Sequence, residues 1–166
     1  VLKVKDRPLT ATVPKPKVGF SYDEYAEISY QAWIGGIDLV KDDENLTNQS
    51  FIKFEKRLQE VMKMRDRAEK ETGERKSYLV NITAPTDEMK RRAKLVKDFG
   101  NEYVMIDVIT AGWAALQTMR DVCEELGLAI HAHRAMHAAF TRNPRHGISM
   151  LVLAKLARLI GVDQLH

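Results

Sequence analysis

Cysteine is nearly absent from this sequence: Cys123 is the only one among 166 residues. A single thiol cannot form an internal disulfide, which argues against a small secreted scaffold held together by disulfides. Cys123 falls on the apolar stripe of a predicted helix, and this position favours a buried, unreactive thiol. The cysteine usage fits a reducing compartment, and we expect a cytoplasmic protein.

Long apolar runs and an excess of one charge are also missing. No stretch approaches the roughly 18 apolar residues of a membrane span, and no secretory leader pattern is present. The 26 Lys and Arg residues are interspersed with 23 Asp and Glu residues, for a net charge of +3. We therefore expect neither a membrane nor nucleic acid as a partner. The composition, 45% hydrophobic and 30% charged, is typical of a globular domain.

What the chain does contain is an alternation of short β-branched runs with amphipathic stretches. The predicted strands are 11–18, 37–41, 77–83, 103–109, 129–133 and 163–166. The intervening helices carry recognisable ends: a capping box begins at Ser21, Thr86 is a predicted N-cap, and Gly73 is a predicted helix stop. The apolar stripe predicted for the last helix comprises Ile148, Leu151, Val152, Leu156 and Leu159.

Five strand–helix units followed by a sixth strand predict an α/β fold with a parallel sheet. An open doubly wound sheet would gather its chemistry near one switch point. Here polar residues follow nearly every predicted strand, which favours a (β/α)₈ TIM barrel whose strand ends meet at one mouth. A full barrel takes about 250 residues. We therefore expect residues 1–166 to form a partial barrel domain, without its last units.

Three polar clusters stand at predicted strand ends. In the first, Lys15 and Lys17 lie two residues apart, so both ammonium groups face the same way on a strand. Close like charges and partial burial would lower a lysine pKa into the range useful for acid–base chemistry. An isolated K-P-K is otherwise typical of a solvated loop.

The second cluster is Lys41-Asp42-Asp43-Glu44. Two carboxylates suit a hard cation such as Mg²⁺, which prefers oxygen ligands. The adjacent Lys41 would repel that cation unless CO₂ converts its amine to a carbamate, which would supply a third anionic ligand. Taken alone, the tetrapeptide is also typical of a solvated turn.

The third cluster is H-A-H-R-A-M-H at 131–137, with His131, His133 and His137 around Arg134. An H-x-H pair is compatible with zinc, but a neighbouring guanidinium disfavours a cation and favours an anion such as phosphate. His166, at the end of the next predicted strand, is a candidate neutral donor to the same anion.

In order along the chain, these segments resemble the large subunit of ribulose-1,5-bisphosphate carboxylase/oxygenase (RuBisCO). The resemblance is carried by T-V-P-K-P-K-V-G at 12–19, G-G-I-D-L-V-K-D-D-E-N at 35–45 and H-A-H-R-A-M-H-A at 131–138. It extends over nearly the whole chain from about Thr10. V-P at 13–14 and I-D-L-V at 37–40 point to the archaeal, form III-like branch. Val13 departs from the threonine that many members have at this position.

The resemblance implies a metal site and a reaction. Lys41 would be the carbamylated lysine, ligating Mg²⁺ together with Asp43 and Glu44, and its carbamate would take the C3 proton of ribulose 1,5-bisphosphate. The reaction would fix CO₂ into two molecules of 3-phosphoglycerate through a Mg²⁺-stabilised enediolate, with an oxygenase side reaction. Lys15 would protonate the product carbanion, and Lys17 would tune Lys15.

The same resemblance implies roles in binding the substrate. His133 would contact the substrate hydroxyl groups and assist proton transfer, and Arg134 and His166 would hold one phosphate. His137 would lie near the site without touching the substrate. The family's sites are shared between subunits of a homodimer or a multiple of dimers. They also use segments beyond 1–166, so we expect this chain alone to be inactive.

Three other functions share some of these features. A RuBisCO-like enolase or isomerase has the same barrel, carbamate and Mg²⁺ but usually lacks several substrate-binding groups that are present here. A metal-dependent amidohydrolase also combines a barrel with an H-x-H pair, although there the pair lies on the first strand. A barrel fragment serving only in folding or assembly is the non-catalytic alternative.

Overall fold

The computed structural model describes residues 2–166. Along this part of the chain, strands and helices follow in the order β1 (Ala11–Thr12), α1 (Tyr22–Ile34), β2 (Leu39–Lys41), α2 (Phe54–Thr72), β3 (Ser77–Asn81), α3 (Thr86–Asp98), β4 (Tyr103–Asp107), α4 (Val108–Ala111), α5 (Trp113–Leu126), β5 (Ala129–His133), α6 (Ala138–Thr141), α7 (Met150–Ile160) and β6 (Gln164–Leu165). None of these helices combines the length and apolar character needed to cross a membrane.

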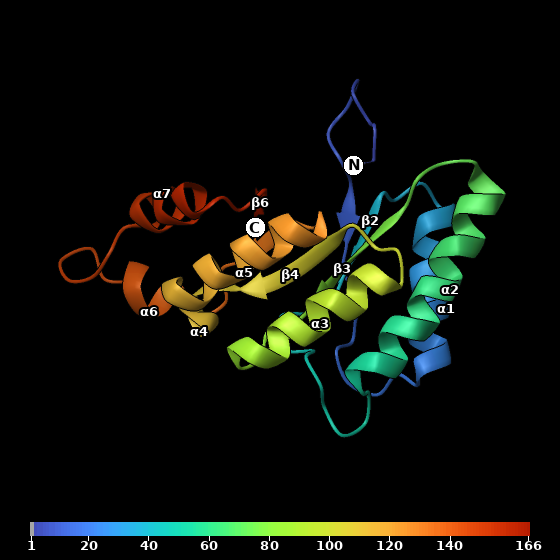
Figure 1. Cartoon of the computed structure of the whole chain (residues 1–166), viewed down its shortest axis with the longest axis horizontal. Helices are drawn as coiled ribbons and strands as arrows, with labels where there is room; N and C mark the ends of the chain where they lie inside the picture. The colour runs from blue at the N-terminus through green and yellow to red at the C-terminus, as the bar shows by residue number, and fades with distance from the viewer. Residues whose placement is uncertain (1) are drawn as a thin grey trace.

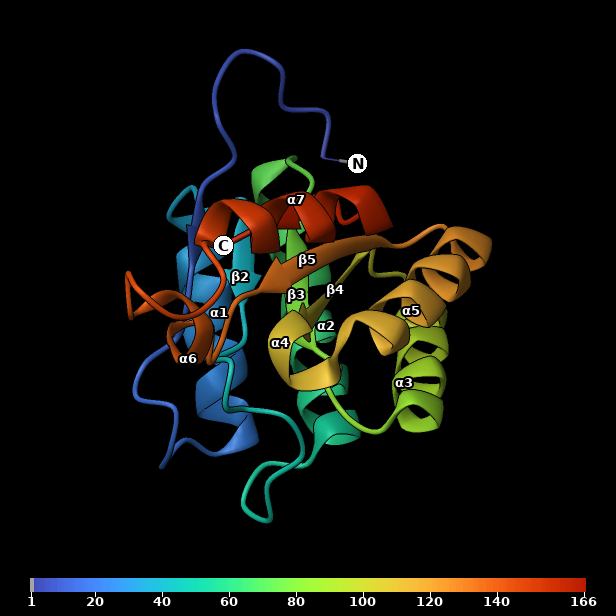
Figure 2. The same ribbon diagram turned by 90° about the vertical axis from the view of Figure 1, so that its left-hand side faces the viewer.

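The six strands form one parallel sheet in which spatial order equals sequence order, β1-β2-β3-β4-β5-β6. A doubly wound sheet would reverse its strand order at a switch point, and this sheet does not. The sheet curls, and the long helices lie around its outer side (Figures 1 and 2). The fold is therefore an incomplete TIM barrel, as the sequence predicts.

Strand alternation divides the buried residues between two faces of the sheet. Val40, Val80 and Ile106 lie on the outer face and belong to the large core shared with the helices. Leu39 and Met105 lie on the inner face, in a smaller cluster near the N-terminal segment. Because side chains alternate along a strand, each strand supplies the helix layer and the barrel interior in turn.

The helix ends agree with the sequence in part. The capping box at Ser21 is confirmed: its hydroxyl accepts from the Glu24 N–H, and the Glu24 carboxylate accepts from the Ser21 N–H at 2.8 Å. The stop at Gly73 is also confirmed, with φ of 70°. The predicted N-cap at Thr86 is wrong by one residue, since Pro85 holds that position and Thr86 begins the helix.

Several strands are shorter than predicted. Range 11–18 contains only the two residues of β1, because Pro14 and Pro16 have no N–H to donate to a sheet. Range 103–109 ends at Asp107, where the chain turns directly into α4. Ranges 37–41, 77–83 and 163–166 each lose two end residues, whereas 129–133 is confirmed as β5.

The last helix exposes its predicted apolar stripe. Leu151 is 65% exposed and Leu159 is 83% exposed, and the other three stripe residues are also exposed. The buried residues of α7 are Leu153 and Ala157 instead, and α7 packs against α5. Apolar residues surround much of this helix, so their spacing alone does not identify the face that packs.

Candidate functional site at the carboxyl ends of the strands

Strand register brings the polar strand ends onto one side of the sheet. Asp107 of β4 pairs with His133 of β5, and Lys41 of β2 pairs with Leu79 of β3. Lys41, Asn81, Asp107 and His133 all occupy inner-face positions at the carboxyl ends of their strands. The predicted gathering of these groups at one mouth is thus present.

Lys41 is a buried lysine, 3% exposed, at the centre of this side. Its Nζ donates to the Asp42 carbonyl oxygen at 2.7 Å and lies 3.6 Å from the Met105 sulfur. Within residues 2–166 it forms no ion pair with a carboxylate. Burial lowers the pKa of Lys41 from its ordinary value, although nearby carboxylates, Glu44 first, oppose that shift. A lowered pKa favours the neutral amine that carbamate formation requires.

Asp43 is buried and forms an ion pair with Lys15. Burial raises the pKa of Asp43, but hydrogen bonds from Lys15 and from Asn45 outweigh burial and lower that pKa to about 2. The lowered pKa predicted for Lys15 is wrong in this structure, because the hydrogen bond to Asp43 raises it. Lys17 lies exposed in the same loop and has no hydrogen bond to the other described residues.

Glu44 follows Asp43 and is half-buried at the edge of the mouth. Its main-chain carbonyl accepts from Asn81 Nδ2 at 2.9 Å, which ties the motif to β3. Its carboxylate Oε2 lies 3.7 Å from His133 Nε2. Asp43 and Glu44 therefore present two carboxylates on the side of the sheet where Lys41 lies.

His133 lies between two carboxyl groups. Its Nδ1 accepts from the Ala135 N–H at 3.1 Å and lies 3.5 Å from Asp107 Oδ1. Acceptance at Nδ1 places the ring proton on Nε2, toward Glu44. Burial and the Lys41 charge lower the pKa of His133 to about 4, so the ring is neutral at pH 7.

Asp107 is 4% exposed, and its Oδ1 has no hydrogen-bond partner in the described chain. Burial raises the pKa of Asp107 to about 6, against hydrogen bonds from Asn81 and Thr83. A cleft of about 640 Å³ is lined by Asp107, Glu44 and Thr83, among others. The site therefore includes a buried carboxyl group with spare hydrogen-bonding capacity.

His131 faces the interior one layer below His133. Its Nδ1 is 3.1 Å from Gln164 Oε1, its Nε2 has no partner among residues 2–166, and burial lowers its pKa to about 4. This part of the chain holds no group of three or more His, Cys, Asp or Glu placed to bind a metal ion. Among these residues the H-x-H pair thus has no third zinc ligand.

Arg134, His137 and His166 border a second, smaller cleft beside His133. The Arg134 guanidinium contacts His137 Nε2, and His137 Nδ1 is 2.9 Å from Thr141 Oγ1. The His166 ring stacks on His133 with a centroid distance of 5.1 Å, and burial lowers its pKa. His137 thus contacts the guanidinium that the sequence assigns to a phosphate.

Two inner-face residues, Asn81 and Asp107, count among the polar strand-end residues that favour a barrel, but the sequence predicts no role in the site for either of them. Both are the last residues of their strands, and alternation from the buried Leu79 and Met105 places them on the inner face. Strand-end position combined with period-two alternation was the signal that could have identified them.

Comparison with known proteins places these features in one family. All of residues 1–166 match the family model described as ribulose bisphosphate carboxylase large chain, catalytic domain. The chain is 67% identical to a ribulose bisphosphate carboxylase of Pyrococcus horikoshii and 62% identical to one of Methanosarcina barkeri. Each alignment covers 98% of this chain and 38% of the relative.

Solved structures agree with the sequence matches. An octameric RuBisCO from Pyrococcus horikoshii superposes with a TM-score of 0.97 at 66% identity, covering 99% of this chain and 39% of that one. A dimeric archaeal RuBisCO from Hyperthermus butylicus gives 0.97 at 64% identity with the same coverage. The archaeal resemblance seen in the sequence is confirmed, and the chain spans about two fifths of the length of these relatives.

Proposed function

This chain belongs to the family of ribulose bisphosphate carboxylase large chains, and from that premise we propose that it supplies the central part of a carboxylase active site. Its substrates would be ribulose 1,5-bisphosphate and CO₂, and its product 3-phosphoglycerate. The observation that supports this most is Lys41, a buried amine with a lowered pKa, next to two carboxylates but without an ion pair to any carboxylate of residues 2–166.

In this proposal Lys41 first captures an activating CO₂. The neutral amine attacks the carbon of CO₂, an N–C bond forms, and one proton leaves the nitrogen, which gives an anionic carbamate. Only the unprotonated amine has the lone pair for this step, so the burial that lowers the pKa of Lys41 favours it. Asp42 accepts from Nζ only through its backbone carbonyl, which leaves the amine free of a carboxylate.

The donors around Lys41 fit Mg²⁺. Asp43 and Glu44 are oxygen donors of the kind that this ion prefers, and the Lys15 ammonium already lies against Asp43, so that carboxylate attracts a cation. The carbamate of Lys41 would add a third anionic oxygen donor beside these two carboxylates. When bound, Mg²⁺ would stabilise negative charge that develops on the substrate oxygens.

The remaining residues bind substrate and move protons. Carbamylated Lys41 accepts the proton from C3 of the substrate, and Lys15 delivers a proton to the product carbon. Neutral His133 donates from Nε2 to a substrate hydroxyl group, with Asp107 beside its ring. Lys17 stays near Lys15 as a second positive charge.

One phosphate would be held at the smaller cleft. Arg134 presents a planar guanidinium suited to two parallel hydrogen bonds with phosphate oxygens, and His166 adds a neutral donor. His137 contacts Arg134 and holds its orientation. We place the enzyme in the cytoplasm and, by analogy with its dimeric and octameric relatives, in a dimer or a multiple of dimers whose other segments complete the site.

The test uses a full-length large chain that carries this segment. With ¹³C-bicarbonate and Mg²⁺, we expect a carbamate ¹³C signal assigned to Lys41 and formation of phosphoglycerate from ribulose 1,5-bisphosphate. A bare amine at Lys41 under these conditions would refute the proposal. Enolisation of the substrate without carboxylation would indicate the RuBisCO-like alternative, which the presence of Lys15, His133 and Arg134 does not favour.

A further inference from the structure

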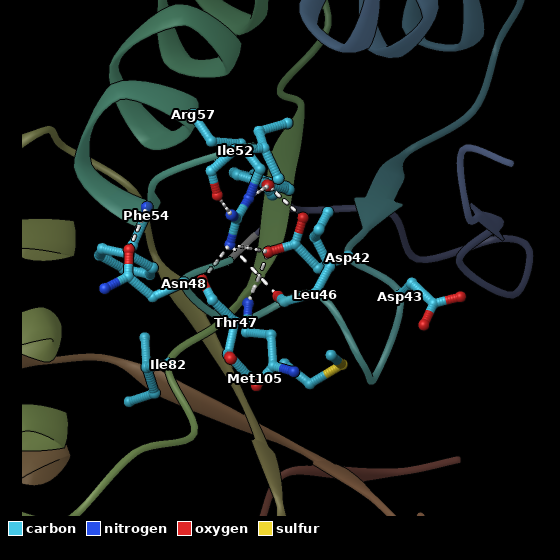
Figure 3. Close-up of polar contacts among 12 residues, drawn as sticks. Asp42, Asp43, Leu46, Thr47, Asn48, Ile52, Phe54, Arg57, Ile82 and Met105 are labelled. Atoms are coloured by element: carbon cyan, nitrogen blue, oxygen red, sulfur yellow. Dashed lines mark hydrogen bonds and ion pairs between the residues drawn. The ribbon is translucent and has the colours of Figure 1, made fainter. Parts of the chain in front are cut away.

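Asp42 lies between two of the proposed metal ligands but points away from them. Lys41, the last residue of β2, occupies an inner-face position, whereas the Asp42 carboxylate is bound by side chains of α1, α2 and β3. Figure 3 shows the Asp42 and Asp43 carboxylates pointing in different directions. Asp42 is 0% exposed, so its carboxylate depends entirely on protein donors.

Four donors from three different elements converge on this carboxylate. The Tyr25 hydroxyl of α1 donates to Oδ1 at 2.8 Å, and the Tyr78 hydroxyl of β3 donates to the same oxygen. Oδ2 accepts from Arg57 Nη2 of α2 at 3.1 Å and from the Asn81 N–H at 2.9 Å. Asp42 therefore ties the end of β2 to β3 and to both covering helices.

Arg57, which pairs with Asp42, also binds the loop that follows residues 41–44. Its guanidinium is 0% exposed and also donates to the carbonyl oxygens of Leu46, Thr47 and Ile52, at 3.3, 3.1 and 3.4 Å (Figure 3). Burial by itself would lower the pKa of Arg57, but the Asp42 charge together with Tyr78 and Tyr25 outweighs burial and raises that pKa. The loop that leaves Glu44 is thus held by the same ion pair.

The hydrogen bonds around Asp42 also extend to Glu44, through Asn81. The Asn81 N–H donates to Asp42, and the Asn81 side chain donates to the Glu44 carbonyl oxygen at 2.9 Å. All three proposed ligands are therefore fixed around Asp42: Lys41 and Asp43 are its chain neighbours, and Glu44 is held one hydrogen bond beyond Asn81.

We infer that Asp42 and Arg57 are positioning residues for the metal site, acting on Mg²⁺ affinity through the backbone of residues 41–44. The inference rests on the proposed function, since it concerns the same three ligands. Removing groups that orient metal ligands typically weakens metal binding by about 10–100-fold. A purely stabilising ion pair would change the unfolding temperature and leave Mg²⁺ affinity unaltered.

Asp38, the residue directly before β2, provides a matched control. It is 2% exposed and accepts from Arg7 at 2.6 and 2.8 Å and from the Thr10 N–H at 2.7 Å, at the opposite end of β2. It is a buried, arginine-paired aspartate like Asp42, but it contacts none of the proposed ligands. Asp38→Asn should thus destabilise the protein without changing the metal site.

The experiment compares Asp42→Asn with Asp38→Asn in a full-length large chain that carries this segment. Mg²⁺ affinity is measured by calorimetry at saturating bicarbonate, at a temperature where circular dichroism shows each variant folded. We expect the Mg²⁺ dissociation constant to rise about tenfold or more in Asp42→Asn and to stay at the wild-type value in Asp38→Asn. Excess Mg²⁺ should restore much of the turnover of Asp42→Asn, with KM for the substrate near wild type.

If Asp42→Asn does not fold, a second variant tests the same inference. The double variant Tyr25→Phe/Tyr78→Phe removes two donors and keeps the Asp42–Arg57 ion pair, and it should also weaken Mg²⁺ binding about tenfold. A smaller change in whichever variant folds, or an equal loss in Asp38→Asn, overturns the inference. Absence of bicarbonate-dependent Mg²⁺ binding in the wild type would instead refute the proposed function, so the two failures are distinguishable.

Discussion

Two buried lysines at opposite ends of the sheet have different surroundings. Lys76, at the amino end of β3, is 0% exposed, and its Nζ forms an ion pair with Glu74 at 2.7 Å. Lys41, at the carboxyl end of β2, is 3% exposed and has a backbone carbonyl and a methionine sulfur as neighbours. A buried ammonium group that forms no direct ion pair among residues 2–166 is costly to keep charged, and such a lysine at a strand end is a candidate functional group.

Other buried polar groups follow the same division. At the amino end, Asp38 is saturated by Arg7 and Thr10, and the Asn101 side chain bonds to the backbone of β3 and β4. Three buried side-chain polar atoms lack a partner within residues 2–166, and two of them, on Asp107 and His131, lie in the carboxyl-end mouth. The amino end is built for stability, and the carboxyl end keeps polar groups available for ligands.

The largest expected effect separates the two lysines. In a full-length large chain, Lys41→Met removes a metal ligand and a proton acceptor, and carboxylation should fall at least about 10³-fold. Lys76→Met removes an ion pair far from the mouth and should leave kcat unchanged. Phosphoglycerate formation under saturating Mg²⁺ and bicarbonate is the measurement. Equal losses of carboxylation in the two variants would contradict the assignment of function to the carboxyl end of the sheet.

Asp107→Asn tests how much folding stability the ionised Asp107 carboxyl group costs. The folded state raises the pKa of Asp107 from 3.8 to about 6, so it binds the proton more tightly than the unfolded state. Stability should therefore fall as pH rises from about 4 to 6, by roughly 2–3 kcal/mol. In the Mg²⁺-free protein, calorimetry should show this slope in the wild type and its loss in Asp107→Asn, which should be the more stable of the two above pH 6.

Asp38→Asn should show the opposite pH dependence. The hydrogen bonds from Arg7 outweigh burial and lower the pKa of Asp38, so its contribution is fully present above the unfolded value near 3.8 and is lost as pH falls further. We expect a loss of about 2 kcal/mol at pH 7. The difference from wild type should shrink below about pH 4 in thermal unfolding. A constant difference across this range would show that the charge is not the cause.

The smallest effect is expected at an exposed ion pair of the amino end. Arg75 is 54% exposed and pairs with Glu102 and Glu69. Solvent screens such pairs, so Arg75→Ala should cost about 0.2–1 kcal/mol, with no change in activity. Thermal unfolding at low and high salt gives the measurement, and the cost should diminish in high salt. A loss of carboxylation in this variant would show that the amino end of the sheet also contributes to activity.

The sequence predicted which polar side chains gather at the carboxyl ends of the strands better than it predicted the boundaries of the elements around them. Lys41, Asp43 and His133 were identifiable because alternation and strand-end position act locally along the chain. The extent of β1 and the packing face of α7 were not, because they depend on prolines in a loop and on which neighbours a helix meets. The pKa of Lys15 was predicted in the wrong direction because its partner, Asp43, lies 28 residues away in sequence.

The sequence by itself determined the parallel α/β pattern, the inner-face position of Lys41 and the family, since each depends on local periodicity or on residue identity. Only the tertiary structure decided which charges are paired. It paired Asp43 with the Lys15 ammonium, surrounded Asp42 with donors from three elements and, within residues 2–166, left Lys41 without a carboxylate partner. The physical reason is that desolvation and hydrogen bonding depend on neighbours that chain folding brings together from distant positions.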